Sequence, residues 1–275
     1  MTERNPLLFI HGGPGMNSYA EHALLAPLVT NKGFEPTFWN EPSKDRPEGF
    51  PFDPANAFMG LVESVKKQIS ELRERSSKVH IVCLSFAVHP LFNALLEDSR
   101  GIDSILIVSP VFHFKKEIWN IIGFAEKDFE ENAPDKAAAL KKLRRESERF
   151  FDEKMQQALQ IGAEDESLFT NYWHNKTAMA NYFGVWEKFG ATLDLVSFFS
   201  AMGQFATIDE SFSGKSFEIP TTVVFGKHDR VVHQDDEIRK CKELFPNLTI
   251  HTFDQSGHYP HIEETERFLD LLSRQ

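Results

Sequence analysis

A serine, an aspartate and a histidine occupy sequence patterns that are typical of nucleophilic catalysis. Ser85 lies in the run VCLSFAV (82–88), where a predicted strand meets a predicted helix. Asp229 lies in GKHDRVV (226–232) and His258 in SGHYPHIEE (256–264), each directly after a later predicted strand. A hydroxyl beside an imidazole that a carboxylate orients can attack a carbonyl carbon. We therefore interpret these residues as nucleophile, acid and base.

Each of the three signals has an ordinary structural alternative. A nucleophile on a sharp strand-to-helix turn needs small residues two positions before and after it. Cys83 and Ala87 are small, although neither is glycine. A serine at such a junction is otherwise a common helix N-cap, and single loop aspartates and histidines are commonly solvated. The order Ser85, Asp229, His258, each after the carboxyl end of a predicted strand, favours the catalytic interpretation.

The run HGGPG, at His11–Gly15, follows the first predicted strand. Glycines there let the backbone turn tightly and expose N–H groups that can hold an oxyanion. Pro14 has no N–H, so Gly13 is the candidate donor. A phosphate loop is disfavoured, because neither GxGxxG nor GxxxxGK[ST] is present.

The elements that carry these residues alternate between short apolar runs and longer helical patterns. Such alternation predicts an α/β fold with a doubly wound, mainly parallel sheet of about six strands. We expect strands at 7–10, 34–39, 79–84, 105–109, 221–225 and 249–253, and helices near 18–30, 55–75, 86–98, 234–244 and 261–273.

The alternation stops between about Val111 and Lys215, which predicts a helical insertion after the fourth strand. Within it, Asn132–Asp135 is typical of a helix start. One apolar helix face is expected from Leu140, Leu143, Phe150, Phe151, Met155 and Leu159. The basic run at 141–145 lies off this face and is interpreted as solvated.

Taken together, these segments resemble the α/β-hydrolase fold family, and HGGPG with a serine elbow is most similar to its proline iminopeptidase-like branch. The resemblance implies a core at 1–110 and 216–275 with a helical cap at 111–215. It also implies Ser85 as nucleophile, Asp229 as orienting acid and His258 as base, with an oxyanion hole made by the N–H groups of Gly13 and Phe86.

The sequence departs from that branch at three places. The branch has a DQRGxGxS-like stretch after the strand expected at 34–39, where this chain has Asn40–Lys44. Its elbow reads GxSWGG, whereas this one reads CLSFAV. The first strand begins near Leu7, which leaves no room for the antiparallel strands that open the family fold, so we expect a trimmed sheet. These departures affect the expected aminopeptidase specificity more than the three candidate catalytic residues.

Composition narrows the classes of function and partner. The chain has 275 residues, 41% hydrophobic and 26% charged, as in an ordinary globular protein. A formal net charge of −11 disfavours binding to nucleic acid or to anionic membranes. The two cysteines form no disulfide framework, and no signal peptide or spanning segment is recognised, so we expect a cytoplasmic protein. His258 and His261 lack the companions of a metal site, and neither a metal nor a cofactor is expected.

We expect a small-molecule substrate in an apolar pocket under the cap, which is rich in aromatic residues. The favoured function is hydrolysis of a carboxylic ester or amide through an acyl-enzyme. A proline iminopeptidase-like aminopeptidase is an alternative, for which Glu126, Glu164 or Glu166 would be an amine anchor. A non-catalytic ligand-binding protein on the same scaffold is the alternative from another class.

Overall fold

Six parallel strands form the central sheet of the computed structural model, which describes residues 4–44, 50–189 and 191–275. The strand order is β2-β1-β3-β4-β5-β6, and every neighbouring pair is parallel. The strands are β1 (Asn5–Ile10), β2 (Phe34–Trp39), β3 (Val79–Leu84), β4 (Ile102–Val108), β5 (Thr221–Gly226) and β6 (Leu248–Phe253). The predicted six-stranded parallel sheet is confirmed, and β1 is the first strand in the described part of the chain.

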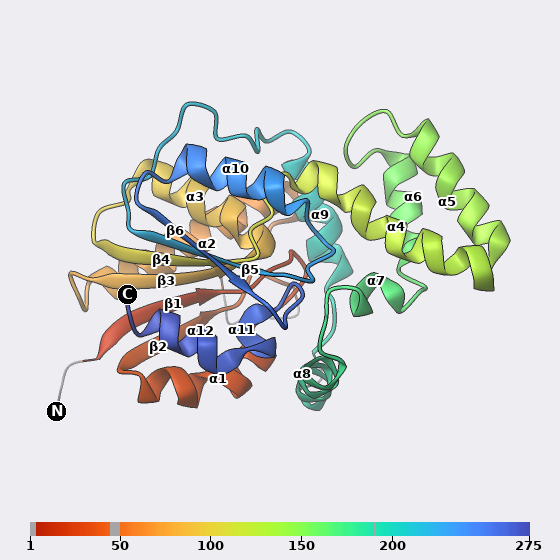
Figure 1. Ribbon diagram of the computed structural model, residues 1–275. Helices are drawn as coiled ribbons and strands as arrows, with labels where there is room; N and C mark the ends of the chain where they lie inside the picture. Colours follow the sequence, from red (N-terminus) through yellow and green to blue (C-terminus); the bar gives the residue numbers. More distant parts are fainter. Residues whose placement is uncertain (1–3, 45–49, 190) are drawn as a thin grey trace.

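Helices cover both faces of this sheet (Figure 1). Successive side chains of a strand point to opposite faces. Leu7 and Phe9 accordingly pack with α1 (Tyr19–Asn31) and α12 (Thr265–Leu272). Leu8 and Ile10 belong to the opposite core, with α2 (Ala57–Arg73), α3 (Val88–Glu97) and α10 (Gln234–Leu244). Burial on both faces explains why the strands are continuous apolar runs.

Between β4 and β5 the chain forms a helical segment that lies mostly to one side of the sheet (Figure 1). Its helices are α4 (Phe114–Asn132), α5 (Pro134–Glu146), α6 (Glu153–Gly162), α7 (Ser167–Thr170), α8 (Lys176–Lys188) and α9 (Leu195–Phe205). Two further short elements matter below: a 3-10 turn over Ser85–Ala87 and a helical turn, α11 (Pro260–Glu263). A third, a 3-10 turn over Pro54–Asn56, precedes α2.

The single apolar helix face expected through Leu140 and Leu159 is wrong, because these residues belong to two helices, α5 and α6. Asp152 caps α6 by accepting from the N–H of Met155, and its carboxylate also accepts from the N–H groups of Glu148 and Arg149. These bonds hold a turn between the two helices. The expected helix start near 132–135 is correct in position, but α5 begins at Pro134, and Asn132 ends α4.

Candidate active site

Ser85 lies at a sharp turn between β3 and α3. Its φ is +56°, a backbone region that residues other than glycine rarely occupy, at a cost of about 1–3 kcal/mol. Its side chain caps neither of the two helical elements that follow, so the N-cap interpretation does not account for it. The surrounding strand and helix must therefore impose the strained conformation.

The residues two positions before and after Ser85 pack tightly between strand and helix. Cys83 and Ala87 are both buried. Burial also raises the pKa of the Cys83 thiol far above its ordinary value, which keeps the sulfur protonated. Cys83 is thus part of the core beneath Ser85, and an unreactive one.

Ser85, His258 and Asp229 form a continuous chain of hydrogen bonds. The Ser85 Oγ lies 2.9 Å from His258 Nε2, and His258 Nδ1 lies 2.8 Å from Asp229 Oδ2. Asp229 Oδ1 accepts from the N–H of Val231 at 2.8 Å. The side chains of His258 and Asp229 are almost wholly shielded from water. The structure thus brings together the three residues that the sequence singled out.

Two glycines allow the loops of Asp229 and His258 to meet. A Cβ on Gly226 would lie 1.9 Å from the carbonyl oxygen of Gly257, and a Cβ on Gly257 would lie 2.5 Å from that of Tyr172. The N–H of His228 donates to the Ser256 carbonyl at 2.9 Å, which ties the two loops together. Larger residues at either glycine would separate the segments that carry the acid and the base.

The helical segment also touches His258. The N–H of His258 donates to the carbonyl of Tyr172 at 2.6 Å, and the Tyr172 ring meets the imidazole edge-on, with centroids 5.2 Å apart. This contact has no sequence signal, because the acceptor is a backbone carbonyl between α7 and α8.

The glycine-rich loop lies directly beside Ser85. A Cβ on Gly12 would lie 3.2 Å from the Ser85 Cβ. Gly13 has a φ of +120°, so the backbone turns sharply there. On the other side of Ser85, the Phe86 ring is buried against Phe58 and Phe205.

The segment Asn40–Lys44, where the sequence departs from the resembled branch, holds this loop in place. Glu41 is buried and accepts from the N–H of Gly15 at 2.8 Å, and Asn40 accepts from the N–H of Ser18 at 2.9 Å. The Gly15 carbonyl accepts from the N–H of Asp194, at the start of α9. The loop is thus bound both to the segment that follows β2 and to the helical segment.

The sequence analysis missed two glutamate–histidine contacts that join α4 to α10 near Asp229. Glu117 of α4 accepts from His233, and Glu237 of α10 accepts from His113, in both cases through the backbone N–H and Nδ1 at 2.8–3.2 Å. Hydrogen bonding to Glu237 raises the pKa of His113. The signal was present as a repeated pattern, since each glutamate follows its own helix's histidine by four positions.

Other residues that the sequence suggested as possible site residues make contacts that are explained by packing or ion pairing. His89 is buried with its Nε2 2.9 Å from the Val111 carbonyl, and burial lowers its pKa to about 3. His11 stacks on Trp39. Glu126 and Glu164, two of the possible amine anchors, pair with Arg144 and Lys136. No group of three or more His, Cys, Asp or Glu side chains within the described ranges is arranged to hold a metal.

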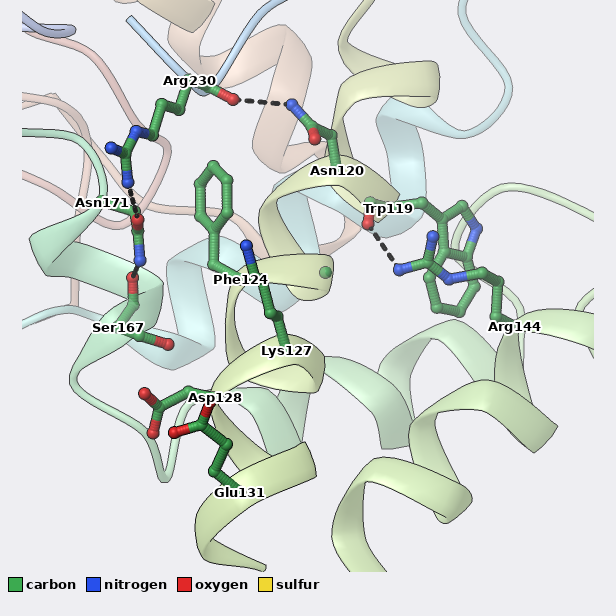
Figure 2. Close-up of a pocket in the computed structure, with 11 residues that line it drawn as sticks. Trp119, Asn120, Phe124, Lys127, Asp128, Glu131, Arg144, Ser167, Asn171 and Arg230 are labelled. Carbon is green, nitrogen blue, oxygen red and sulfur yellow. Dashed lines mark hydrogen bonds between the residues drawn. The ribbon is translucent and has the colours of Figure 1, made fainter. Parts of the chain in front are cut away.

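A cleft of about 590 Å³ lies beside the Asp229 loop. Figure 2 shows Arg230 at one end, Phe124 and Lys127 in the middle, and Asp128 and Glu131 at the other end. Arg230 reaches Asn171 through a 3.0 Å hydrogen bond, and its carbonyl accepts from Asn120. Ser85 does not line this cleft.

This geometry agrees with what a comparison with protein families finds. Residues 102–265 match the model of the alpha/beta hydrolase fold family. Since the match spans more than half of the chain, the protein belongs to this family. A search of curated proteins by sequence finds no match.

Among the described residues, no helix has the length and apolar character needed to cross a membrane.

Solved structures with a similar fold are named after different activities. A proline iminopeptidase-related protein from Thermus thermophilus is 18% identical, with a TM-score of 0.69 over 99% of this chain and 89% of the other. An esterase from Exiguobacterium antarcticum is 12% identical, with a TM-score of 0.59 over 100% and 92%. A variant of a meta-cleavage product hydrolase from Pseudomonas fluorescens is 18% identical, with a TM-score of 0.59 over 99% and 90%. At these identities the likeness extends to the fold alone, so function has to be argued from the site.

Proposed function

We propose that this protein is a serine hydrolase that cleaves a small-molecule carboxylic ester or amide, with Ser85 as nucleophile, His258 as base and Asp229 as orienting acid. The hydrogen-bond chain from Ser85 Oγ through His258 to Asp229 carries the proposal. The strained backbone at Ser85 adds support, because such strain concentrates at functional positions.

In the first half-reaction, Ser85 Oγ attacks the substrate carbonyl carbon while its proton passes to His258 Nε2. The His258 Nδ1–H donates to the Asp229 carboxylate, which fixes the tautomer and stabilises the imidazolium that forms. The tetrahedral intermediate then collapses. The bond to the leaving group breaks, and His258 returns the proton to the leaving alkoxide or amine, which leaves Ser85 acylated.

The second half-reaction repeats these steps with water. His258 takes a proton from the attacking water, the acyl–Ser85 bond breaks, and the proton returns to Ser85 Oγ. In both steps negative charge develops on the carbonyl oxygen. We assign its stabilisation to the N–H groups of Gly13 and Phe86, because Gly13 belongs to the loop that contacts Ser85 and Phe86 follows Ser85 directly. Removing one such donor typically reduces the rate by about 10²–10³-fold.

We further propose that residues 111–215 act as the cap over a core formed by 1–110 and 216–275. These ranges include residues 1–3, 45–49 and 190, which lie outside the described part of the structure. The contact of Tyr172 with His258 and the bond from Asp194 to Gly15 support this role, because both connect the proposed cap to the proposed catalytic loops. The substrate's acyl and leaving groups would then be selected by the cap.

The test is an assay of the purified protein on p-nitrophenyl esters of graded chain length and on prolyl and alanyl arylamides. We expect ester cleavage that falls by at least about 10³-fold in Ser85→Ala. Prolyl-arylamide cleavage would instead favour the aminopeptidase alternative. Activity that persists in Ser85→Ala would overturn the proposed nucleophile, and silence on both panels would favour the non-catalytic binding protein.

A further inference from the structure

A smaller cleft, of about 480 Å³, lies where the helical segment meets the loop after β5. Residues 170–179 form one side, and His228 and Arg230 form the other. The polar lining consists of Thr170, Asn171, His174, Lys176, His228 and Arg230. No aspartate or glutamate is among the described residues that line it. We propose that this cleft, which we call the cationic cleft, binds a small molecule through a carboxylate or phosphate group.

The two permanent cations of the cationic cleft lack carboxylate partners. Neither Lys176 nor Arg230 forms an ion pair with a residue in the described ranges. Arg230 uses one Nη1–H to reach Asn171, and the guanidinium has further donors in a fixed fork that suits carboxylate and phosphate. In a chain of net charge −11, two cations without carboxylate partners in one cleft are what an anionic ligand would require.

Two imidazoles complete the lining in a fixed arrangement. The rings of His174 and His228 are stacked, with centroids 3.8 Å apart and planes 10° from parallel. His228 Nε2 lies 3.1 Å from the Asp254 carbonyl, and the N–H of His174 donates to Glu263 at 2.8 Å. Because the His174 ring stacks on a His228 ring that is itself tied to the Asp254 carbonyl, binding would require little ordering of these side chains.

Two acidic residues that contact the histidines of the lining have side chains that are engaged elsewhere. Glu263 accepts from the N–H groups of His174, Asn175 and Gly257, and Asp254 pairs with Lys227 and Arg267. The cleft of about 590 Å³ shares Asn171 and Arg230 with the cationic cleft, but Asp128 and Glu131 also lie within its lining (Figure 2). An anion is therefore expected to select the cationic cleft.

The cationic cleft adjoins the proposed catalytic loops without including Ser85. His228 and Arg230 flank Asp229 in the chain, and His174 lies two positions after Tyr172, which contacts His258. Binding is accordingly expected to survive replacement of the nucleophile. Its measurement in Ser85→Ala separates a failure of this inference from a failure of the proposed hydrolase function.

The experiment is a calorimetric titration of Ser85→Ala with inorganic phosphate and, separately, with malonate, against sodium chloride at equal ionic strength. We expect saturable binding at one site by at least one of the two anions, and the responding anion identifies the preferred group. The ring proton resonances of His174 and His228 should shift with the same saturation curve.

Lys176→Glu and Lys188→Glu provide a matched pair, because both residues lie on α8 and only Lys176 lines the cleft. We expect Lys176→Glu to weaken binding at least tenfold and Lys188→Glu less than twofold. Lys176→Gln serves as a milder variant if Lys176→Glu fails to fold. Binding no stronger than that of chloride, equal effects of the two α8 charge reversals, or unshifted histidine signals would overturn the proposal.

Discussion

Two of the contacts between the helical segment and the helices that cover the sheet bury carboxyl groups in contrasting ways. These are α4 against α10, which we call the α4–α10 seam, and α8 against α1, which we call the α1–α8 seam. At the α4–α10 seam, Glu117 and Glu237 each accept from the N-cap histidine of the opposite helix, and Glu237 also accepts from the N–H of Phe112. At the α1–α8 seam, Glu21 Oε1 accepts from the Tyr182 hydroxyl at 2.8 Å, and Glu21 Oε2 has no hydrogen-bond partner among the described residues. Burial then raises the pKa of Glu21 to about 7.

The difference shows how the number of donors decides the consequence of burying an acid. Several N–H donors at two helix N-termini stabilise each buried carboxylate of the α4–α10 seam. The hydrogen bonds from the backbone N–H of Glu21 and from the Tyr182 hydroxyl do not outweigh the desolvation of Glu21, so this group favours its neutral form up to about pH 7. We therefore expect one seam to contribute mainly rigidity and the other mainly pH dependence.

The largest effect on stability is expected from Glu237→Gln. The amide keeps one acceptor, but its NH₂ group would face either the N–H of Phe112 or the donors of His113, because these contact different oxygens of Glu237. Breaking a buried charged contact of this kind destabilises by about 3–5 kcal/mol. Urea unfolding measures it, with the exposed Glu243→Gln on the same helix as control. Equal losses in the two variants would show that the α4–α10 seam does not depend on its buried carboxylates.

A smaller, pH-dependent effect is expected from Glu21→Gln. The pKa of Glu21 is raised from 4.5 to about 7 in the folded state, so the unfolded state binds fewer protons between these values, and stability falls as pH rises through this window. Glu21→Gln removes this loss and should be more stable than the original protein at pH 8, by at most about 3 kcal/mol.

Thermal or urea unfolding at pH 5 and pH 8 tests this expectation. The advantage of Glu21→Gln should shrink toward pH 5, where Glu21 is already neutral in the folded protein. The contact of His113 with Glu237 also makes the original protein less stable as pH rises. The raised pKa of His113 adds stability that is lost above the ordinary histidine range. An advantage that is independent of pH would contradict the assignment of this titration to Glu21.

The smallest effect is expected from Trp186→Phe at the α1–α8 seam. The indole Nε1–H donates to Asn17 Oδ1 at 2.9 Å, which also accepts from the N–H of Tyr19. Losing this one neutral hydrogen bond should destabilise by about 1 kcal/mol. Urea unfolding with Asn17→Ala and the double variant measures the coupling. A coupling near zero would mean that the hydrogen bond contributes nothing to the seam.

The sheet could be predicted from sequence because strands buried on both faces are continuous apolar runs, as in Leu7–Ile10 and Val79–Leu84. The helices of the segment between β4 and β5 were harder to predict. The spacing of Leu140, Leu143, Met155 and Leu159 is compatible with one helix, and the break depends on the Asp152 carboxylate, whose bonds hold a turn there. A polar side chain that ends a helix through local hydrogen bonds leaves little trace in an apolar pattern.

At the candidate site, the sequence was informative where chemistry constrains residue type at a strand end, as at Ser85, Asp229 and His258. It was silent on contacts made through the backbone, such as the Tyr172 carbonyl that accepts from His258. Stacking of His174 on His228 was equally invisible, because the two residues are distant in the chain and meet only once the helical segment is folded onto the loop after β5.

The most direct test of the central claim is labelling with a fluorophosphonate probe, read by intact mass and by mapping the modified peptide. An activated Ser85 Oγ should attack the phosphorus and give one adduct per chain on Ser85, absent in Ser85→Ala and strongly slowed in His258→Gln. Cys83 and Ser109 should remain unmodified, because both are buried. A folded protein that is not labelled, or that is labelled at another residue while Ser85 stays free, would contradict the assignment of Ser85, His258 and Asp229 as a catalytic unit.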